Sequence, residues 1–426
     1  MTKYILLLSF LVQACTSGPS PDEARYIAIE HTNVVDVING QLVPDQTVVI
    51  KDSLIHYIGD NWQGSGHHVE IIDGHGKYLM PGLWDMHVHV CWEQSNDSLV
   101  FPALLANGIT GFRDMGGDLG IQDIFKSRVE ANPAVGPEIF GAGPIIDGNP
   151  PMMVDFSIAV DDKIDIPHLL DSLVANGADF IKTYSLLRET ELAKISDYAH
   201  THLIPFAGHL SEYVEPEVAI DLGQKSVEHL NRLEEIWSEN EARIGQIAEQ
   251  MVEKQTWLCP TLIVYYLKAH LRDSSIIHPE YEANIHPLLK QEWQTSRENR
   301  LNRYDSVAWI NQLALFERQK ALVAFMHDKG VKLLSGSDFA GMPYVYPGIG
   351  LHHELFLLHE SGLSNAEVLA TATINPATYL SIQDKYGSVT VGKYADLILL
   401  DGNPLDDLEN LGVIHILFRK GRKINR

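Results

Sequence analysis

Two histidines one residue apart, His87 and His89, follow a mostly apolar segment at residues 83–86. Side chains alternate along a β-strand, so both imidazoles would point to the same side and could hold one metal ion. The chain has 20 histidines, so an incidental pair on a solvated strand explains this motif equally well. Ligands elsewhere in the chain are needed to decide between the two interpretations.

Four more polar residues stand in or at the ends of other apolar runs: Lys182, His209, His229 and Asp338. Each alone has a structural explanation, such as a buried hydrogen bond, an ion pair or a helix cap. If the runs are strands of one barrel, however, their carboxyl ends meet around one pocket. Six such residues in register favour a single site over six separate structural roles.

Strand and helix patterns alternate over about residues 81–380, and these elements would position the candidate residues. Helical patterns such as 166–176 and 189–202 lie between the predicted strands. The eight predicted strands cover residues 83–90, 108–115, 138–146, 178–185, 203–210, 226–230, 256–264 and 331–339. This alternation predicts an α/β fold, a (β/α)8 TIM barrel. A doubly wound open sheet is the alternative, but no Gly-x-Gly-x-x-Gly turn opens a helix in the required context.

Short strand patterns at both chain ends predict a second, smaller domain. Before the barrel they cover 26–29, 34–38, 47–50, 54–58 and 69–72, with the hairpin signal Asn39-Gly40. After the barrel they cover 388–391, 395–400 and 413–418. We expect one small β-sandwich built from both ends, with a leader and tether in 1–22, sandwich strands in 23–80 and 383–426, and the barrel in 81–382.

The first residues indicate export. A basic start, an apolar run at 4–12 and Ala14 before Cys15 resemble a bacterial lipoprotein signal in which Cys15 is lipidated. Ordinary secretion and a buried apolar start are the alternatives. We expect an exported, membrane-anchored lipoprotein on the periplasmic or cell-surface side of a bacterial envelope, attached only through its lipid.

Apart from Cys15, the chain contains only two cysteines, Cys91 and Cys259. We expect two lone buried thiols unless these residues prove adjacent, in which case they could form a disulfide.

The order of the candidate residues resembles that of the amidohydrolase superfamily, over about residues 25–426. Pro81-Gly82 leads to His87 and His89, the other four candidates follow in order, and residues 392–397 (Gly-Lys-Tyr-Ala-Asp-Leu) are also typical. Residues 108–117 and 177–182 are more narrowly similar to the imidazolonepropionase-like and Xaa-Pro dipeptidase-like branch.

The resemblance implies two divalent metal ions and a carboxylated Lys182 that bridges them. His87, His89, Lys182 and Asp338 would bind the buried ion, and Lys182, His209 and His229 the more exposed one. Carbamylation by CO₂ makes the lysine an anionic oxygen ligand, and an apolar strand favours the neutral amine that reacts. Imidazole and carboxylate donors suit Zn²⁺, although manganese, cobalt or iron would also fit.

The implied reaction is hydrolysis of an amide or peptide bond by a hydroxide that bridges the metals, with Asp338 passing the proton to the leaving amine. Tyr184, two residues beyond Lys182, could hydrogen-bond the substrate. Arg113 could hold a substrate carboxylate, or could instead pair internally with Asp114 or Asp118.

A dipeptide or N-acyl amino acid is the expected small-molecule substrate. Hydrolysis of a cyclic amide or deamination of a heterocycle is the alternative, and a non-catalytic surface binding protein is a third possibility. Deaminase relatives generally use one metal and lack the bridging lysine, which argues against the second interpretation.

The net charge of −24 argues against a nucleic-acid partner, and an oligomer is compatible with the sequence.

Two further features stay open. The polar stretch 268–303, inside the long interval before the last strand, is either a lid over the site or a surface helical insertion. His352 and Glu354 either line the rim of the pocket or cap a helix, and capping is the preferred interpretation.

Overall fold

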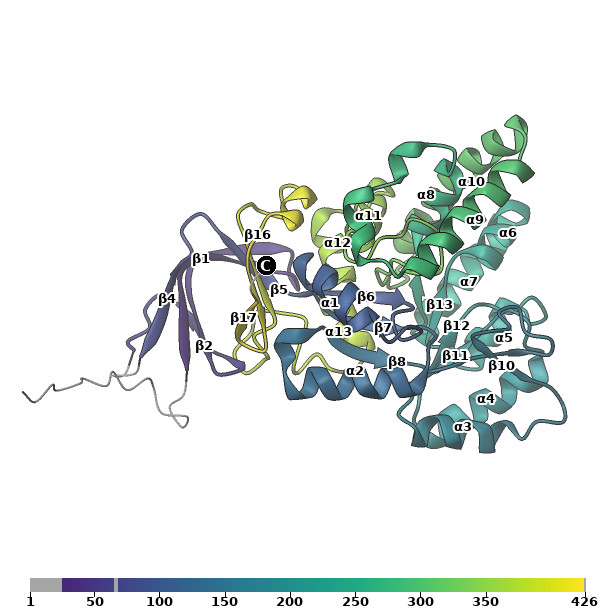
Figure 1. Cartoon of the computed structure of the whole chain (residues 1–426), viewed down its shortest axis with the longest axis horizontal. Helices are drawn as coiled ribbons and strands as arrows, with labels where there is room; N and C mark the ends of the chain where they lie inside the picture. Colours follow the sequence, from purple (N-terminus) through teal and green to yellow (C-terminus); the bar gives the residue numbers. More distant parts are fainter. Residues whose placement is uncertain (1–24, 65–67, 425–426) are drawn as a thin grey trace, which may run out of the picture.

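The computed structural model describes residues 25–64 and 68–424. Figure 1 shows a strand-rich part beside a larger part in which helices surround strands. The predicted signal and Cys15 lie outside the described residues. Within the described ranges, no helix combines the length and the hydropathy needed to cross a membrane.

Eight parallel positions close the larger part into a barrel, one of them shared by the consecutive strands β8 and β9 and the last held by residues 331–339. Its strands are β6 (Leu83–Val88), β7 (Ile109–Asp114), β8 (Glu138–Gly141), β9 (Ile145–Gly148), β11 (Ile181–Thr183), β12 (Phe206–Gly208), β13 (Ser226–Glu228) and β14 (Trp257–Cys259). Pairing runs from β6 through β7 to β8, which leads directly into β9, and from β9 through β11, β12 and β13 to β14. Parallel bridges Leu258–Leu333 and Val88–Phe339 join residues 331–339 to β14 and β6 and complete the ring. The predicted (β/α)8 barrel is confirmed.

The predicted barrel strands differ from the observed ones in three places. Residues 331–339 are held by isolated bridges and not by a regular ladder. The predicted strand 256–264 ends at Cys259, because helix α8 begins at Leu262. The predicted strand 138–146 is divided into β8 and β9, and an additional strand, β10 (Ser157–Val160), pairs with β9.

Thirteen α-helices occur among the described residues, and most of them cover the barrel (Figure 1). They are α1 (Asn96–Ala106), α2 (Leu119–Ala131), α3 (Ile166–Ala175), α4 (Glu189–His202), α5 (Pro216–Asp221), α6 (Asn231–Glu239), α7 (Glu241–Lys254), α8 (Leu262–His270), α9 (Pro287–Arg303), α10 (Ser306–Asp328), α11 (Ile349–Glu360), α12 (Asn365–Thr371) and α13 (Ile374–Tyr379). Four short 3₁₀ helices add to them: Pro133–Val135, Ser274–Ile276, Pro279–Asn284 and Leu408–Gly412. Side-chain caps explain several starts: Asp118, Asp165 and Asn240 each accept a hydrogen bond from a backbone N–H in the first turn of the helix that follows.

The two chain ends combine into one eight-stranded sheet. Its strands are β1 (Tyr26–Asp36), β2 (Gln41–Lys51), β3 (Leu54–Gly59), β4 (Val69–Asp73), β5 (Tyr78–Pro81), β15 (Leu397–Leu400), β16 (Ile414–Arg419) and β17 (Arg422–Ile424). Gly40, at φ +65°, turns the β1–β2 hairpin that Asn39-Gly40 predicted. The predicted strands 26–29 and 34–38 are one strand with an irregular register, and the predicted strand 388–391 is wrong because that segment forms no strand. The expected sandwich therefore takes the form of a single sheet that joins both ends of the chain.

The parallel barrel strands bring their carboxyl ends to one side of the barrel, and the candidate residues lie on that side.

Cys91 and Cys259 are both buried free thiols, so the expectation of two lone thiols without a disulfide is confirmed.

Candidate metal centre

The four predicted histidines have their Nδ1 atoms occupied by four different partners. These contacts are His87 with Glu228 Oε2 (2.8 Å), His89 with the Gly116 carbonyl (3.0 Å), His209 with Ser185 Oγ (2.9 Å) and His229 with Thr261 Oγ1 (2.6 Å). A partner on Nδ1 fixes the orientation of an imidazole and reserves Nε2 for a ligand, as in histidine metal sites. The arrangement suits four imidazoles that bind through Nε2.

The histidines and Asp338 lie close together. Ring centres are 4.7 Å apart for His87 and His229, 4.7 Å for His209 and His229, and 5.5 Å for His87 and His89. Asp338 Oδ1 lies 3.4 Å from Nε2 of both His87 and His89. The ligand atoms of His87, His229 and Asp338 all lie within 4.8 Å of one another, a spacing that a shared cation could fill.

Lys182 belongs to the same cluster and is buried with 1% of its surface exposed. Its Nζ has no hydrogen-bond partner among the described residues, and neither has Nε2 of His87. Buried polar atoms are nearly always paired, so two orphaned atoms in one cluster indicate a site for a further group. Burial lowers the pKa of Lys182 to about 8, which makes the neutral amine accessible near neutral pH. These observations fit a metal centre with a modified lysine.

The electrostatics of the cluster favour metal binding. Burial lowers the pKa of His87 to about 4 and holds the pKa values of His209 and His229 well below the usual value. A metal binds the neutral imidazole, so no proton must be displaced from these three rings. Burial alone would raise the pKa of Asp338, but its interactions with His87, His89 and His229 outweigh burial and hold the pKa of this carboxyl below its usual value.

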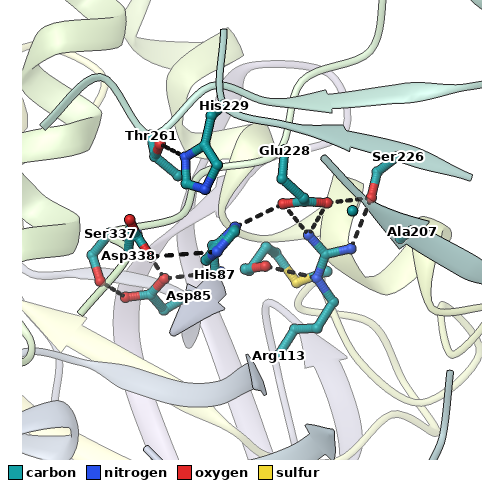
Figure 2. Close-up of polar contacts among 12 residues, drawn as sticks. Asp85, His87, Arg113, Ala207, Ser226, Glu228, His229, Thr261, Ser337 and Asp338 are labelled. Atoms are coloured by element: carbon teal, nitrogen blue, oxygen red, sulfur yellow. Dashed lines mark hydrogen bonds and ion pairs between the residues drawn. The ribbon is translucent and has the colours of Figure 1, made fainter. Parts of the chain in front are cut away.

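A second carboxylate positions Asp338. Asp85 on β6 accepts hydrogen bonds from the backbone N–H (2.9 Å) and Oγ (2.6 Å) of Ser337. Asp338 itself donates its backbone N–H to the His87 carbonyl at 2.7 Å. These bonds hold residues 335–338 against β6, and Figure 2 shows Asp338 beside the His87 ring. The side chain of Asp85 was not predicted from the sequence as part of the site.

Arg113 is a correction to the sequence analysis, because its side chain does not reach the pocket. It is fully buried, and its Nη2 donates to both carboxylate oxygens of Glu228 at 2.8 Å. Its other nitrogens donate to the Met86 carbonyl, Ser226 Oγ and Tyr379 OH. With every donor engaged, Arg113 cannot hold a substrate carboxylate. The internal pair considered from the sequence exists, but with Glu228 in place of Asp114 or Asp118.

Glu228 is the main feature that sequence reasoning missed. Figure 2 shows its carboxylate between the His87 ring and the Arg113 guanidinium. Strand alternation would place neighbouring Glu228 and His229 on opposite faces. His229, however, has φ +65°, and this left-handed conformation ends the alternation so that both side chains point inward. Asp338 (φ +56°) and Thr261 (φ +49°) are also left-handed, and such strained residues cluster at functional sites.

An inner cavity of about 180 Å³ opens over this cluster. Four candidate ligands line it (His89, His209, His229 and Asp338), together with Tyr184 and an apolar wall of Trp92, Ile145, Met153, Phe156 and Leu289. The Tyr184 ring lies 3.9 Å from the His209 ring, and burial raises the pKa of Tyr184, so its hydroxyl stays a donor. Leu289 and Glu292 of α9 also line the cavity, so the long insertion contributes to the pocket wall.

His352 and Glu354 lie outside the pocket. His352 Nε2 bonds the Asn107 carbonyl at 2.9 Å, and Glu354 accepts the backbone N–H of Ile263 at 2.8 Å in the first turn of α8. Glu354 thus caps a neighbouring helix, in agreement with the capping interpretation.

The comparisons with known proteins agree with this geometry. The model of the amidohydrolase family matches residues 78–424. An adenine deaminase of Moorella thermoacetica is 40% identical over 77 residues, which is 18% of this chain and 12% of that protein. An imidazolonepropionase of Idiomarina loihiensis is 30% identical over 108 residues, 24% of this chain and 26% of that protein. The chain therefore matches much less than two thirds of the length of these relatives. The solved structure of a Xaa-Pro dipeptidase with bound methionine has a TM-score of 0.71 and 19% identity, covering 94% of this chain and all of that one, which shows a common fold.

Proposed function

The chain belongs to the amidohydrolase family, and from this premise we propose that it is a metal-dependent hydrolase of amide-type carbon–nitrogen bonds. Its proposed substrates are dipeptides or N-acyl amino acids. One observation supports this proposal most: four histidines with occupied Nδ1 atoms surround an orphaned lysine and an ionised aspartate at the carboxyl ends of barrel strands.

His87, His89, Asp338 and carboxylated Lys182 would hold one divalent ion, and Lys182, His209 and His229 a second. Zn²⁺ suits this set of imidazole and carboxylate donors best. When bound, such ions supply Lewis acidity toward the substrate carbonyl and a water-derived nucleophile at neutral pH. Glu228 orients the His87 ring, and Arg113 holds Glu228 in turn.

The remaining chemistry is assigned to side chains of this protein. Asp338, ionised among the histidines, accepts a proton on its carboxylate and delivers it to the leaving nitrogen. Tyr184 keeps its proton and donates a hydrogen bond to the substrate carbonyl oxygen. The apolar wall of the inner cavity excludes water from the reacting groups and favours a substrate with an apolar portion.

Hydrolysis of a cyclic amide or deamination of a heterocycle is the second candidate. The similarity to an adenine deaminase and to an imidazolonepropionase favours it, within the short segments that match. The orphaned Lys182 favours the first candidate, because a lysine bridge belongs to a two-metal site.

For the cellular location, we propose an exported lipoprotein anchored through Cys15. This proposal is supported by the sequence argument alone.

We expect metal-reconstituted protein to release an amine from members of Xaa-Pro, Xaa-Lys, Xaa-Arg and N-acyl amino acid libraries. Product formation is measured by chromatography, with chelator-treated protein as the control. Activity on adenine or on cyclic amides alone would support the second candidate. Fully metallated protein without any turnover would support a binding role and contradict the proposed function.

A further inference from the structure

An exposed apolar segment stands at the edge of the inner cavity. Within residues 152–156, four large apolar side chains are exposed: Met152, Met153, Val154 and Phe156, of which Val154 is the most exposed, at 73%. Single exposed apolar side chains are common on protein surfaces, whereas neighbouring ones in one patch usually mark a contact site. Met153 and Phe156 also line the inner cavity. We call residues 152–156 the apolar lip, because they extend the apolar wall of the cavity to the surface.

The backbone of the apolar lip is held near both of its ends. Asp147, fully buried in β9, accepts the backbone N–H of Met152 at 2.8 Å and that of Leu186 at 2.7 Å. At the other end, the backbone N–H of Ile145 donates to the Phe156 carbonyl at 3.1 Å. These hydrogen bonds define the path of the backbone, so the four apolar side chains are held beside the cavity.

The apolar lip contacts the part of the wall that lies nearest in sequence to the metal centre. The rings of Phe156 and Trp92 meet edge to face, with their centres 6.3 Å apart. Trp92 follows the candidate ligand His89 by three residues, and both residues line the inner cavity. Apolar surface therefore extends from beside the candidate ligands, through Trp92 and Phe156, to the exposed part of the lip.

The charges and the size of the inner cavity indicate which end of a substrate meets the apolar lip. Among the described residues that line the cavity, none is a lysine or an arginine, and the acidic ones are Asp338 and Glu292. Glu292 is exposed on α9, so a substrate carboxylate is disfavoured at this edge of the cavity. The cavity of about 180 Å³ is also smaller than the roughly 300–1,000 Å³ of most ligand pockets, so a large apolar group would extend out of it.

We propose that the apolar lip binds the acyl chain of an N-acyl amino acid while the scissile amide lies in the inner cavity. This inference rests on the proposed function and deepens it, because it selects N-acyl amino acids from the two proposed substrate classes. The carboxylate end of the substrate points away from Glu292, and the acyl chain leaves the cavity along Met153 and Phe156 toward Met152 and Val154. Each CH₂ group that covers the lip is removed from water, which strengthens binding.

The test measures how hydrolysis depends on the length of the acyl chain. Acetyl, butanoyl, hexanoyl and octanoyl derivatives of one amino acid, the one hydrolysed best in the library screen, are compared at concentrations below aggregation. For metal-reconstituted wild-type protein, we expect kcat/KM to rise about 10–60-fold from the acetyl to the octanoyl substrate. This range corresponds to about twofold or less for each CH₂ group that is half removed from water.

Variants of the apolar lip test where this preference arises. Met152→Ser/Val154→Ser changes the two apolar lip residues that do not line the inner cavity, and it should lower the octanoyl-to-acetyl ratio of kcat/KM at least about threefold. The matched control Val307→Ser/Ile310→Ser removes two apolar side chains of α10, each 64% exposed and outside the cavity lining, and should keep the wild-type ratio. The conservative variant Met152→Leu/Val154→Ile should also keep it. Both substrates are measured on one sample, so a folding defect lowers both rates and does not change their ratio.

A kcat/KM that does not rise with chain length, or a ratio that Met152→Ser/Val154→Ser leaves unchanged, would overturn the inference. In the second case, altered self-association or altered binding to phosphatidylglycerol vesicles would assign the lip to a second copy of the chain or to a lipid surface. If the wild-type protein hydrolyses no member of the library, the proposed function itself has failed. Hydrolysis of dipeptides or short N-acyl amino acids without a preference for longer chains refutes the role of the lip alone.

Discussion

Replacing Asp338 by asparagine is expected to lower kcat by about 10²–10⁴-fold while the protein keeps most of its metal. The variant conserves the size of the side chain and an oxygen ligand, and the other five candidate ligands are unchanged. Asparagine cannot accept and return a proton, so the leaving amine would depart unprotonated. Steady-state kinetics give kcat, and elemental analysis of the same sample gives the metal content.

Asp328→Asn, an exposed aspartate at the end of α10, is the control and should behave as the wild type. Loss of metal together with activity would make Asp338 mainly a ligand. Full activity of Asp338→Asn with full metal content would remove Asp338 from the reaction altogether.

Replacing Glu228 by glutamine is expected to lower the free energy of unfolding of the metal-free protein by about 3–5 kcal/mol, because it leaves the buried Arg113 charge without its partner. It should also weaken metal binding about 10–100-fold, because the His87 ring loses the carboxylate on its Nδ1. Denaturant unfolding of chelated protein measures the first effect, and metal titration measures the second.

The control for this variant is Glu217→Gln, which breaks the partly exposed pair with Arg243 and should cost about 1 kcal/mol or less. A double variant, Glu228→Gln with Arg113→Met, should be more stable than Glu228→Gln alone, because the unpaired charge is then absent. A cost for Glu228→Gln similar to that of Glu217→Gln would contradict the role of the buried pair.

The positions of the six candidate ligands could be predicted because each stands in or at the end of a strand with a readable apolar pattern. Parallel strands bring such ends together, so residues from His87 to Asp338 could be assigned to one site without a structure. Residues 331–339 were predicted as a regular strand, but Leu333 and Phe339 make only single bridges, to two different strands. A sequence pattern predicts that a segment is extended, but it does not predict which neighbouring strand the segment pairs with.

The supporting residues could not be predicted, for identifiable physical reasons. Glu228 lies on the inner face of β13 together with Ser226, and His229 lies beside it only because His229 adopts a left-handed backbone, which no neighbouring residue indicates. The role of Arg113 stayed open between a substrate carboxylate and an internal pair, because the sequence shows a cation near a strand end and not that it meets Glu228.

The central claim is that Lys182 joins two metal ions in one centre, and the metal content of the protein tests it most directly. Elemental analysis of protein reconstituted with Zn²⁺ and bicarbonate, then freed of excess metal, should give about two ions per chain. Lys182→Met, which fills the same space without a charge, should remain folded and lose at least one of these ions and the activity. One ion per chain in the wild-type protein, or an unchanged metal content in Lys182→Met, would contradict the claim.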